Sequence, residues 1–218
     1  MRRIAAVVVV LVAVVVLGVA QLVLPGIAAQ RIRSRLAPYG TVRSVSVHAF
    51  PAIELLWHHA DSVHIDLASY HSGTGQVGSL LGQLGGIGSL DVLADQLDVG
   101  LLRLRQASLH KRGSQLTASA QVNESDLRAA VPFLDGVVPV ASADGALTLQ
   151  GQATVLGVTV SATASVLAQD GTLIVSPNLP FGGLATVTLF SDPHVAVQDV
   201  AAAAAPGGFS VSASGLLR

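Results

Sequence analysis

The sequence contains no cysteine among its 218 residues, which excludes a disulfide framework, thiol catalysis and cysteine-ligated metal sites. Charged residues are scarce at 11%, against roughly 25% in an average soluble domain. The formal net charge is -1, so the chain has no overall field that would attract nucleic acid. Aromatic residues make up only 4% of a chain that is 51% hydrophobic, so valine, leucine and alanine supply most of the apolar content. That mixture favours strands packed with small side chains.

A long apolar run at the N-terminus, Ile4 to Leu24, directly follows Arg2 and Arg3. At about 1.5 Å per helical residue it spans roughly 31 Å, which matches the hydrocarbon core of a bilayer at about 30 Å. We therefore predict a single-pass membrane anchor over residues 1–25, with residues 26–218 forming one domain outside the cytoplasm.

A cleaved export signal is the alternative interpretation of the same run. Gly18 and Ala20 supply the small residues that a cleavage site after Ala20 requires. In that case the domain is secreted and not held at the membrane. A buried core helix is less favoured, because a basic pair followed by an uninterrupted apolar run is unusual in a core.

The stretch IAAQRIRSRLAPYG predicts an amphipathic helix over residues 27–40, after Pro25 and Gly26 have ended the apolar run. Its non-apolar surface carries three arginines: Arg31, Arg33 and Arg35. Beside a bilayer these side chains would pair with anionic head groups. The alternative is a solvated helix docked on the domain.

Alternation of apolar and polar residues predicts a series of strands beyond this helix. The strands expected on this basis cover residues 41–50, 62–70, 97–109, 116–122, 187–190, 195–200 and 208–217. Residues 110–115 read as the turn of a hairpin. The glycine-rich segment 72–89 predicts a flexible loop or weak helix, and the alanine-rich segment 201–208 predicts a loop.

Two Asp-Gly dipeptides, Asp144-Gly145 and Asp170-Gly171, predict hairpin turns. The alternating residues between them predict one long strand, bent near Gly157. Upstream, Asn123 is a good N-cap and predicts a short helix that ends at Pro132.

These elements add up to an α+β fold with a single long, curved antiparallel sheet. Its strands present hydroxyl and amide side chains on one face and small apolar side chains on the other. If a helix covers the apolar face only in part, the rest forms a trough that suits acyl chains. The candidate lining residues on the long strand are Val158, Val160, Ala162, Ala164 and Val166.

An aromatic-rich apolar turn follows the first strand, because Pro51 cannot donate to a strand ladder. This turn is either ordinary core or an edge that touches the membrane, with Trp57 at the interface. Its candidate lipid-binding residues are Phe50, Pro51, Ile53, Leu55, Leu56 and Trp57.

Motifs that suggest chemistry are weak in this sequence. Residues 73–78 match GxGxxG, but no compact βαβ unit follows them. His58, His59, Asp61 and His64 lack the helical spacing that aligns metal ligands, so we expect solvated histidines and no metal. No GxSxG elbow is present, and no pair of carboxylates stands out by its spacing. The sequence therefore predicts a protein that is not an enzyme and needs no cofactor.

Three segments carry a resemblance to a known family: VSVHAFPAIELLWHHADSVHIDL at residues 45–67, VNESDL at 122–127 and LFSDPHVAVQDV at 189–200. Together with the N-terminal apolar run, they resemble the LmeA-like phospholipid-binding family of actinobacterial cell-envelope proteins. The resemblance implies an elongated sheet partly wrapped around a long helix, as in tubular lipid-binding (TULIP-like) folds. It also implies phospholipid binding, a possible part in lipid-linked glycan assembly, and no defined catalytic residues.

The leading hypothesis is therefore an envelope protein that binds or transfers phospholipid and holds its acyl chains in an apolar trough. Its expected partners are the membrane and either phospholipid or a lipid-linked glycan. The alternative is a structural or scaffolding β-protein with a closed core. A lipid-modifying enzyme is the third and weakest hypothesis.

Overall fold

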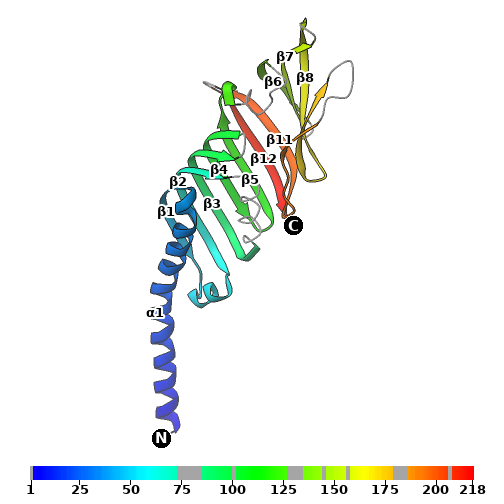
Figure 1. Ribbon diagram of the computed structural model, residues 1–218. Helices are drawn as coiled ribbons and strands as arrows, with labels where there is room; N and C mark the ends of the chain where they lie inside the picture. Colours follow the sequence, from blue (N-terminus) through cyan, green and yellow to red (C-terminus); the bar gives the residue numbers. More distant parts are fainter. Residues whose placement is uncertain are drawn as a thin grey trace.

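Figure 1 shows the computed structural model, which describes residues 2–72, 85–99, 102–126, 135–143, 146–155, 158–178, 186–205 and 208–218. The described residues form one long helix, α1 (Arg2–Leu36), two short 3-10 helices, η1 (Ala37–Tyr39) and η2 (Ala52–Trp57), and strands in two sheets. The predicted α+β composition is confirmed. The predicted single antiparallel sheet is wrong.

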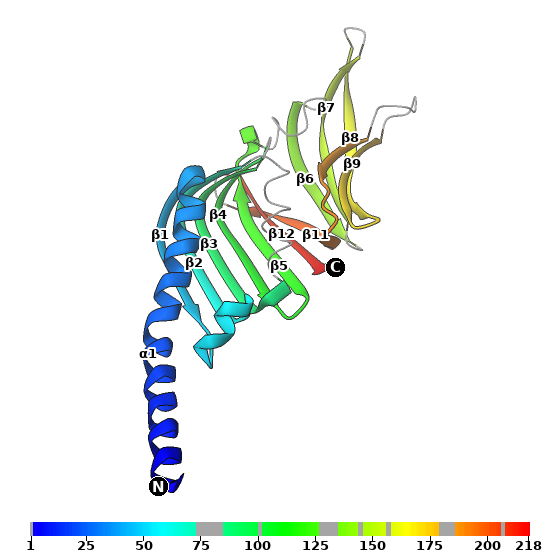
Figure 2. The same cartoon turned by 60° about the horizontal axis from the view of Figure 1, so that its bottom comes forward.

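Helix α1 runs without a break through Pro25, so the N-terminal apolar run and the amphipathic helix predicted after it form one continuous helix. An internal proline costs a helix about 3 kcal/mol, but packing of one face against other elements can outweigh that cost. The C-terminal part of α1 lies against the sheet beside β1, and the N-terminal part projects beyond the sheet (Figures 1 and 2). The packed face includes Ala28, Ile32 and Leu36.

In the part of the chain that the structure describes, no helix combines the length and the apolar character needed to cross a membrane. The predicted span, Ile4 to Leu24, lies mostly in residues 2–18 of α1, whose side chains are outside the described set. The membrane-spanning segment therefore stays a prediction.

The first sheet has seven strands in the order β1-β2-β3-β4-β5-β12-β11. Its strands are β1 (Gly40–His48), β2 (Ala60–Ser72), β3 (Ile87–Val99), β4 (Leu102–Arg112), β5 (Gln115–Val122), β11 (Val195–Ala205) and β12 (Gly208–Leu217). All neighbours are antiparallel except β2 and β3, which run parallel. Because β2 and β3 run the same way, both begin at one end of the sheet, beside η2 and the hairpin between β4 and β5.

The second sheet has five strands in the order β10-β9-β8-β7-β6, and it lies at the β11 edge, on the side away from α1 (Figures 1 and 2). Its strands are β6 (Asp135–Ala143), β7 (Ala146–Val155), β8 (Val158–Gln169), β9 (Thr172–Asn178) and β10 (Val187–Phe190). Strand β11 contacts β6, β7, β8 and β9 and so connects the two sheets.

The long strand predicted between the two Asp-Gly dipeptides is in fact a hairpin. Val155 pairs with Val158, so β7 and β8 run antiparallel and pair along nearly their whole length. The alternation is the same on both sides of the reversal, which is why the pattern alone read as one strand. The turn predicted at Asp170-Gly171 is confirmed: both residues have positive φ, 53° and 80°, and Gln169 pairs with Thr172. Residues 144–145 lie outside the described residues, between the paired ends of β6 and β7.

Other boundaries also differ from the predictions. Strand β3 includes Ile87–Ser89, which were assigned to a loop, and Ala201–Ala205 belong to β11. Hydrogen bonds to a neighbouring strand outweigh the weak strand propensity of alanine and glycine at these positions. The helix predicted after Asn123 begins at Glu124, and its remaining residues lie outside the described ones, as does the GxGxxG segment. The hairpin of β4 and β5 is confirmed, but residues 97–99 of its predicted first strand belong to β3, and residues 110–112 belong to β4 and not to the turn.

Candidate functional site

One face of the seven-stranded sheet carries the apolar side chains, and we call it the apolar face. Near the end where η2 lies, one row of paired residues crosses all seven strands on this face. From β1 to β11 the row consists of Val47, Val63, Leu90, Lys111, Leu116, Gly215 and Val197. Residues of α1 pack over the first part of this row, including Ala28, Ala29 and Ile32. Lys111 is the one charged member of the row.

Farther along the strands, the apolar face is built from small side chains. Ala94, Ala107 and Ala120 are 5–7% exposed and form one cluster with Leu36 of α1. Around them lie half-buried aliphatic side chains: Val42, Ile65, Val92, Leu97, Leu104 and Val211. Small apolar side chains were also expected on one face from the sequence, but here they lie on β1 to β5 and β12 and not on β8.

The predicted lining residues on β8 are in the other sheet. Ala164 is 0% exposed and Val166 is 4% exposed, so both are enclosed by protein. Leu149 and Val175 of the same sheet are also fully buried. The side chains of Val158, Val160 and Ala162 lie outside the described residues. No observation tests whether these residues bind lipid, and their role stays a prediction.

The turn between β1 and β2 forms an exposed apolar lip, which we define as Phe50, Leu56 and Trp57. These side chains are 79%, 61% and 63% exposed. Of the remaining predicted residues of this turn, Pro51 is exposed, while Ile53 and Leu55 are half-buried. Leu55 joins the apolar cluster of Val47, Val63 and Leu90, so the turn that exposes the lip also packs on the apolar face.

Gln21 of α1 holds the backbone of this turn. Its side-chain nitrogen donates to the carbonyl oxygen of Ala49 at 3.0 Å, and its oxygen accepts from the amide of Ala52 at 2.7 Å. The amide of Phe50 donates to Asp61 at 2.7 Å. The sequence signal for Gln21 was its polarity within an apolar run, but only the fold shows which groups it meets.

Close to the lip, the exposed side of helix α1 changes from apolar to polar residues. On its exposed side the large apolar residues are Val19, Leu22, Val23 and Ile27. Beyond them the exposed residues are polar and include Arg31, Arg33 and Arg35, the three predicted to approach the membrane. At about 1.5 Å per residue, Arg31 lies about 15 Å along the helix from Gln21.

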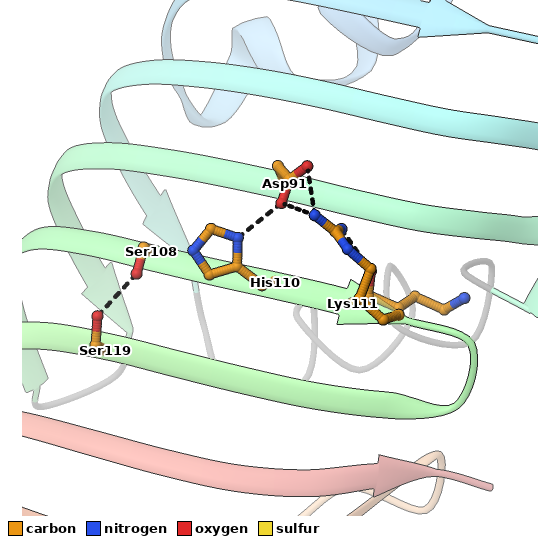
Figure 3. A network of polar contacts seen from close by, with 6 residues as sticks. Asp91, Ser108, His110, Lys111 and Ser119 are labelled. Carbon is orange, nitrogen blue, oxygen red and sulfur yellow. Dashed lines mark hydrogen bonds and ion pairs between the residues drawn. The ribbon is translucent and has the colours of Figure 1, made fainter.

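The opposite face of the sheet, which we call the polar face, carries the network in Figure 3. His110 Nδ1 lies 2.7 Å from Asp91 Oδ1, and Arg112 Nη2 lies 3.1 Å from the same oxygen. The hydrogen bond with His110 is the main cause that lowers the pKa of Asp91, and Arg112 adds to it, while partial desolvation opposes both. His110 and Asp91 are far apart in sequence, and the register of β3 with β4 brings them together.

A shallow depression of about 440 Å³ lies on this polar face, lined by side chains of β4, β5, β11 and β12 that include His110, Thr117, Asp199 and Ser212. It lies on the face of the sheet opposite to the cluster of Ala94, Ala107 and Ala120. Ser108 and Ser119 lie 2.8 Å apart and bond to each other (Figure 3). Neither serine has a hydrogen bond to His110 among the described contacts, so a serine nucleophile next to a base is not assembled here.

The histidine cluster does not form a metal site in the described part of the chain, where no three histidine, aspartate or glutamate side chains converge as ligands. His59 Nδ1 instead lies 3.0 Å from the carbonyl oxygen of Trp57. His58 follows η2 with a left-handed backbone at φ 62°.

Lys111 is the residue of the apolar face that sequence reasoning missed. It is 2% exposed, and its ammonium group donates to the carbonyl oxygen of Ile87. Burial lowers the pKa of this lysine below its ordinary value. The available signal was its position two residues after Leu109, in the apolar phase of the strand.

Comparison with known proteins gives one decisive match. A family model described as LmeA-like phospholipid-binding covers residues 15–206, nearly the whole chain. The chain belongs to the LmeA-like phospholipid-binding family. The resemblance drawn from the sequence motifs is thereby confirmed. Neither the curated proteins nor the solved structures provide a significant match. Membership in the LmeA-like family favours phospholipid binding over catalysis, because the family's description is one of binding.

Proposed function

We propose that this LmeA-like protein binds phospholipid with its acyl chains along the apolar face and its head group near the apolar lip. The observation that carries the proposal is that one turn both exposes the lip and packs on the apolar face through Leu55. A lipid leaving a bilayer at Trp57 would meet apolar side chains along its whole path. Each buried CH₂ contributes about 0.8 kcal/mol, so ten carbons would contribute roughly 8 kcal/mol before ordering costs.

The length of the apolar face suits this ligand. From the row that contains Val63 to Tyr70, strand β2 rises about 23 Å at roughly 3.3 Å per residue. One leaflet of a bilayer core is about 15 Å thick, half of the roughly 30 Å total, and that is the span of its acyl chains. Tails that start at the lip would therefore end on the sheet, among the small side chains of Ala94 and Ala107.

We further propose that the protein works at the cell-envelope membrane, outside the cytoplasm, with the lip in contact with the bilayer. Tryptophan and phenylalanine suit the interface of a bilayer, and the exposed apolar side of α1 lies next to the lip. The arginines of α1 begin about 15 Å farther along the helix, so they would meet head groups only if the helix is tilted. Secretion after cleavage of the N-terminal segment remains the alternative to an anchor.

Extraction of the purified protein with organic solvent, followed by mass spectrometry, tests the ligand. We expect phospholipid at a stoichiometric level. The same spectra would show a lipid-linked glycan, which could occupy the face with the same kind of tail and would connect the protein to glycan assembly. Repeated extraction without any lipid, together with no uptake of a fluorescent phospholipid, would reject the proposal.

Fluorescence of Trp57, the only tryptophan of the chain, tests the membrane contact. Anionic vesicles should shift its emission to shorter wavelength, because the indole moves from water into an apolar layer. Replacing Phe50 and Leu56 by serine should weaken vesicle binding by on the order of tenfold or more, through lost apolar burial. Leu93→Ser, an exposed position on the polar face, is the matched control and should bind like the wild type. An emission spectrum that vesicles leave unchanged would argue against the lip.

The second candidate is a structural role, and the five-stranded sheet favours it locally. Leu149, Ala164 and Val175 are all 0% exposed, so that sheet has a closed core. A protein that binds no lipid but holds a partner through β6 to β10 would fit this observation. Lipid extraction separates the two functions.

A further inference from the structure

Lys111 stands out because it is a buried charge in the middle of apolar side chains. It is the only lysine of the chain and is 2% exposed. Its neighbours across β3 and β5 are Leu90 and Leu116, both of which are buried. In Figure 3 its ammonium group points away from Asp91, on which the neighbouring His110 and Arg112 converge.

The only acceptor that the described residues offer to the ammonium group is the carbonyl oxygen of Ile87. No described carboxylate lies within ion-pair distance of it. A buried cation without a counter-ion destabilises a protein, because one carbonyl replaces only part of the water that the charge has lost. Packing alone therefore gives no reason for a lysine at a position where leucine or methionine would fit the apolar row.

An anionic ligand would supply the missing counter-ion. We propose that Lys111 binds the phosphate of the phospholipid held on the apolar face, an inference that rests on the function proposed above. The ammonium group of lysine is a compact charge on a flexible stem, and it pairs well with phosphate oxygens. Its four-carbon stem allows the group to leave the carbonyl of Ile87 and turn toward a ligand.

The position of Lys111 along the strands agrees with a head-group site. Ile87 and Leu90, its two immediate contacts on β3, belong to the same apolar cluster as Leu55 of η2. Lys111 thus lies at the end of the sheet where η2, the short helix that carries Leu56 and Trp57 of the lip, packs on the apolar face. A phosphate there would remain at the lip end of the sheet, while the tails extend toward Tyr70 at the other end.

The alternative is that Lys111 only satisfies the carbonyl of Ile87. Two substitutions separate the possibilities. Lys111→Met removes both the charge and the hydrogen bond, whereas Lys111→Gln removes the charge and keeps an N–H donor of nearly the same reach. Arg112→Met is the matched control, because it removes one positive charge from the adjacent residue on the polar face, where the side chain is 60% exposed.

The experiment measures the affinity of the full-length protein for phosphatidylglycerol and for diacylglycerol with the same two acyl chains. Both lysine variants should bind phosphatidylglycerol about tenfold or more weakly, the loss expected for one charge-assisted hydrogen bond. Their affinity for diacylglycerol should stay within about twofold of the wild type, which also shows that the apolar face is folded. Arg112→Met should bind both lipids like the wild type.

Each other outcome overturns the inference in a recognisable way. Unchanged affinity of both variants for phosphatidylglycerol would show that Lys111 does not contact phosphate. Equal losses for both lipids would show that the side chain shapes the face and does not recognise the head group. If inorganic phosphate bound through Lys111 and neither lipid bound, the site would be one for a free anion. A wild-type protein that binds neither lipid nor phosphate would overturn the proposed function itself.

Discussion

Three consecutive residues of β4 place basic side chains in two different environments, one on each face of the sheet. On the polar face His110 and Arg112 share the carboxylate of Asp91 and remain open to water. On the apolar face Lys111 is buried and donates to one carbonyl oxygen. The difference shows that charge on this sheet has two roles. His110 and Arg112 are already paired with Asp91, whereas the buried Lys111 has no counter-ion among the described residues.

A similar contrast separates Lys111 from Gln21, a polar side chain of α1 that is half-buried against the turn. Gln21 uses both its donor and its acceptor on the backbone of the turn that carries the lip. Its contacts are complete without a ligand, so we assign it a structural role. Completeness of hydrogen bonding thus distinguishes a residue that holds the fold from one that is available to bind.

The largest loss of stability should come from truncating a buried side chain of the apolar face. Leu90 is 3% exposed and Leu93, on the same strand but the other face, is 42% exposed. Leu90→Ala should lower the free energy of unfolding by about 2–5 kcal/mol, because it removes buried methyl groups and leaves a cavity. Leu93→Ala should change it by less than about 0.5 kcal/mol.

Chemical denaturation of both variants measures this difference. Equal losses for Leu90→Ala and Leu93→Ala would mean that the two faces are not distinguished by burial. The contrast between His110 on an exposed face and Lys111 on a buried face would then not be supported.

A smaller loss of stability should follow from removing the two hydrogen bonds of the Gln21 side chain. Gln21→Ala leaves the carbonyl of Ala49 and the amide of Ala52 without their partner, which should cost about 1–3 kcal/mol. Gln30→Ala, at an exposed position on the same helix, is the control and should be nearly neutral.

Hydrogen exchange adds a local readout to the stability measurement. Exchange of the Ala52 amide should accelerate in Gln21→Ala and not in Gln30→Ala. Protection that is equal in the two variants would show that the lip is held by other contacts.

The smallest effect concerns the exposed charges. The pKa of Asp91 is lower in the folded protein than in the unfolded chain, so the contribution of its pairs is present above the unfolded pKa and is lost as the pH falls through the folded pKa. Asp91→Asn should therefore flatten the decrease of stability toward acid pH and have little effect on lipid binding. Asp199→Asn, whose carboxylate bonds only to Ser214 in the described contacts, is the control.

Unfolding curves collected from neutral to acid pH would measure this flattening. A steep acid decrease that persists in Asp91→Asn would assign the pH dependence to other carboxylates. Such a result would show that the pairing of His110 and Arg112 with Asp91 does not determine how stability changes with pH.

Local patterns predicted several elements well and failed where two elements share one pattern. The hairpin of β4 and β5 and the turn at Asp170-Gly171 follow from alternation and from a residue pair that favours positive φ. The β7–β8 hairpin was missed because apolar and polar residues alternate in the same way in both strands, so the pattern does not show where the chain reverses. The turn around Trp57 was singled out from its residues as either core or an edge that touches the membrane, and only the assembled fold shows that Trp57 is exposed.

The sequence by itself determined the family, the strand-rich composition and the separation of polar from small apolar side chains, because these depend on the order of residues along the chain. Tertiary structure alone decided the division into two sheets, the parallel pairing of β2 with β3, and the placement of Lys111 between Leu90 and Leu116. Which strands become neighbours is set by contacts between distant segments. The environment of a side chain, and with it the need of a buried charge for a partner, exists only after those contacts have formed.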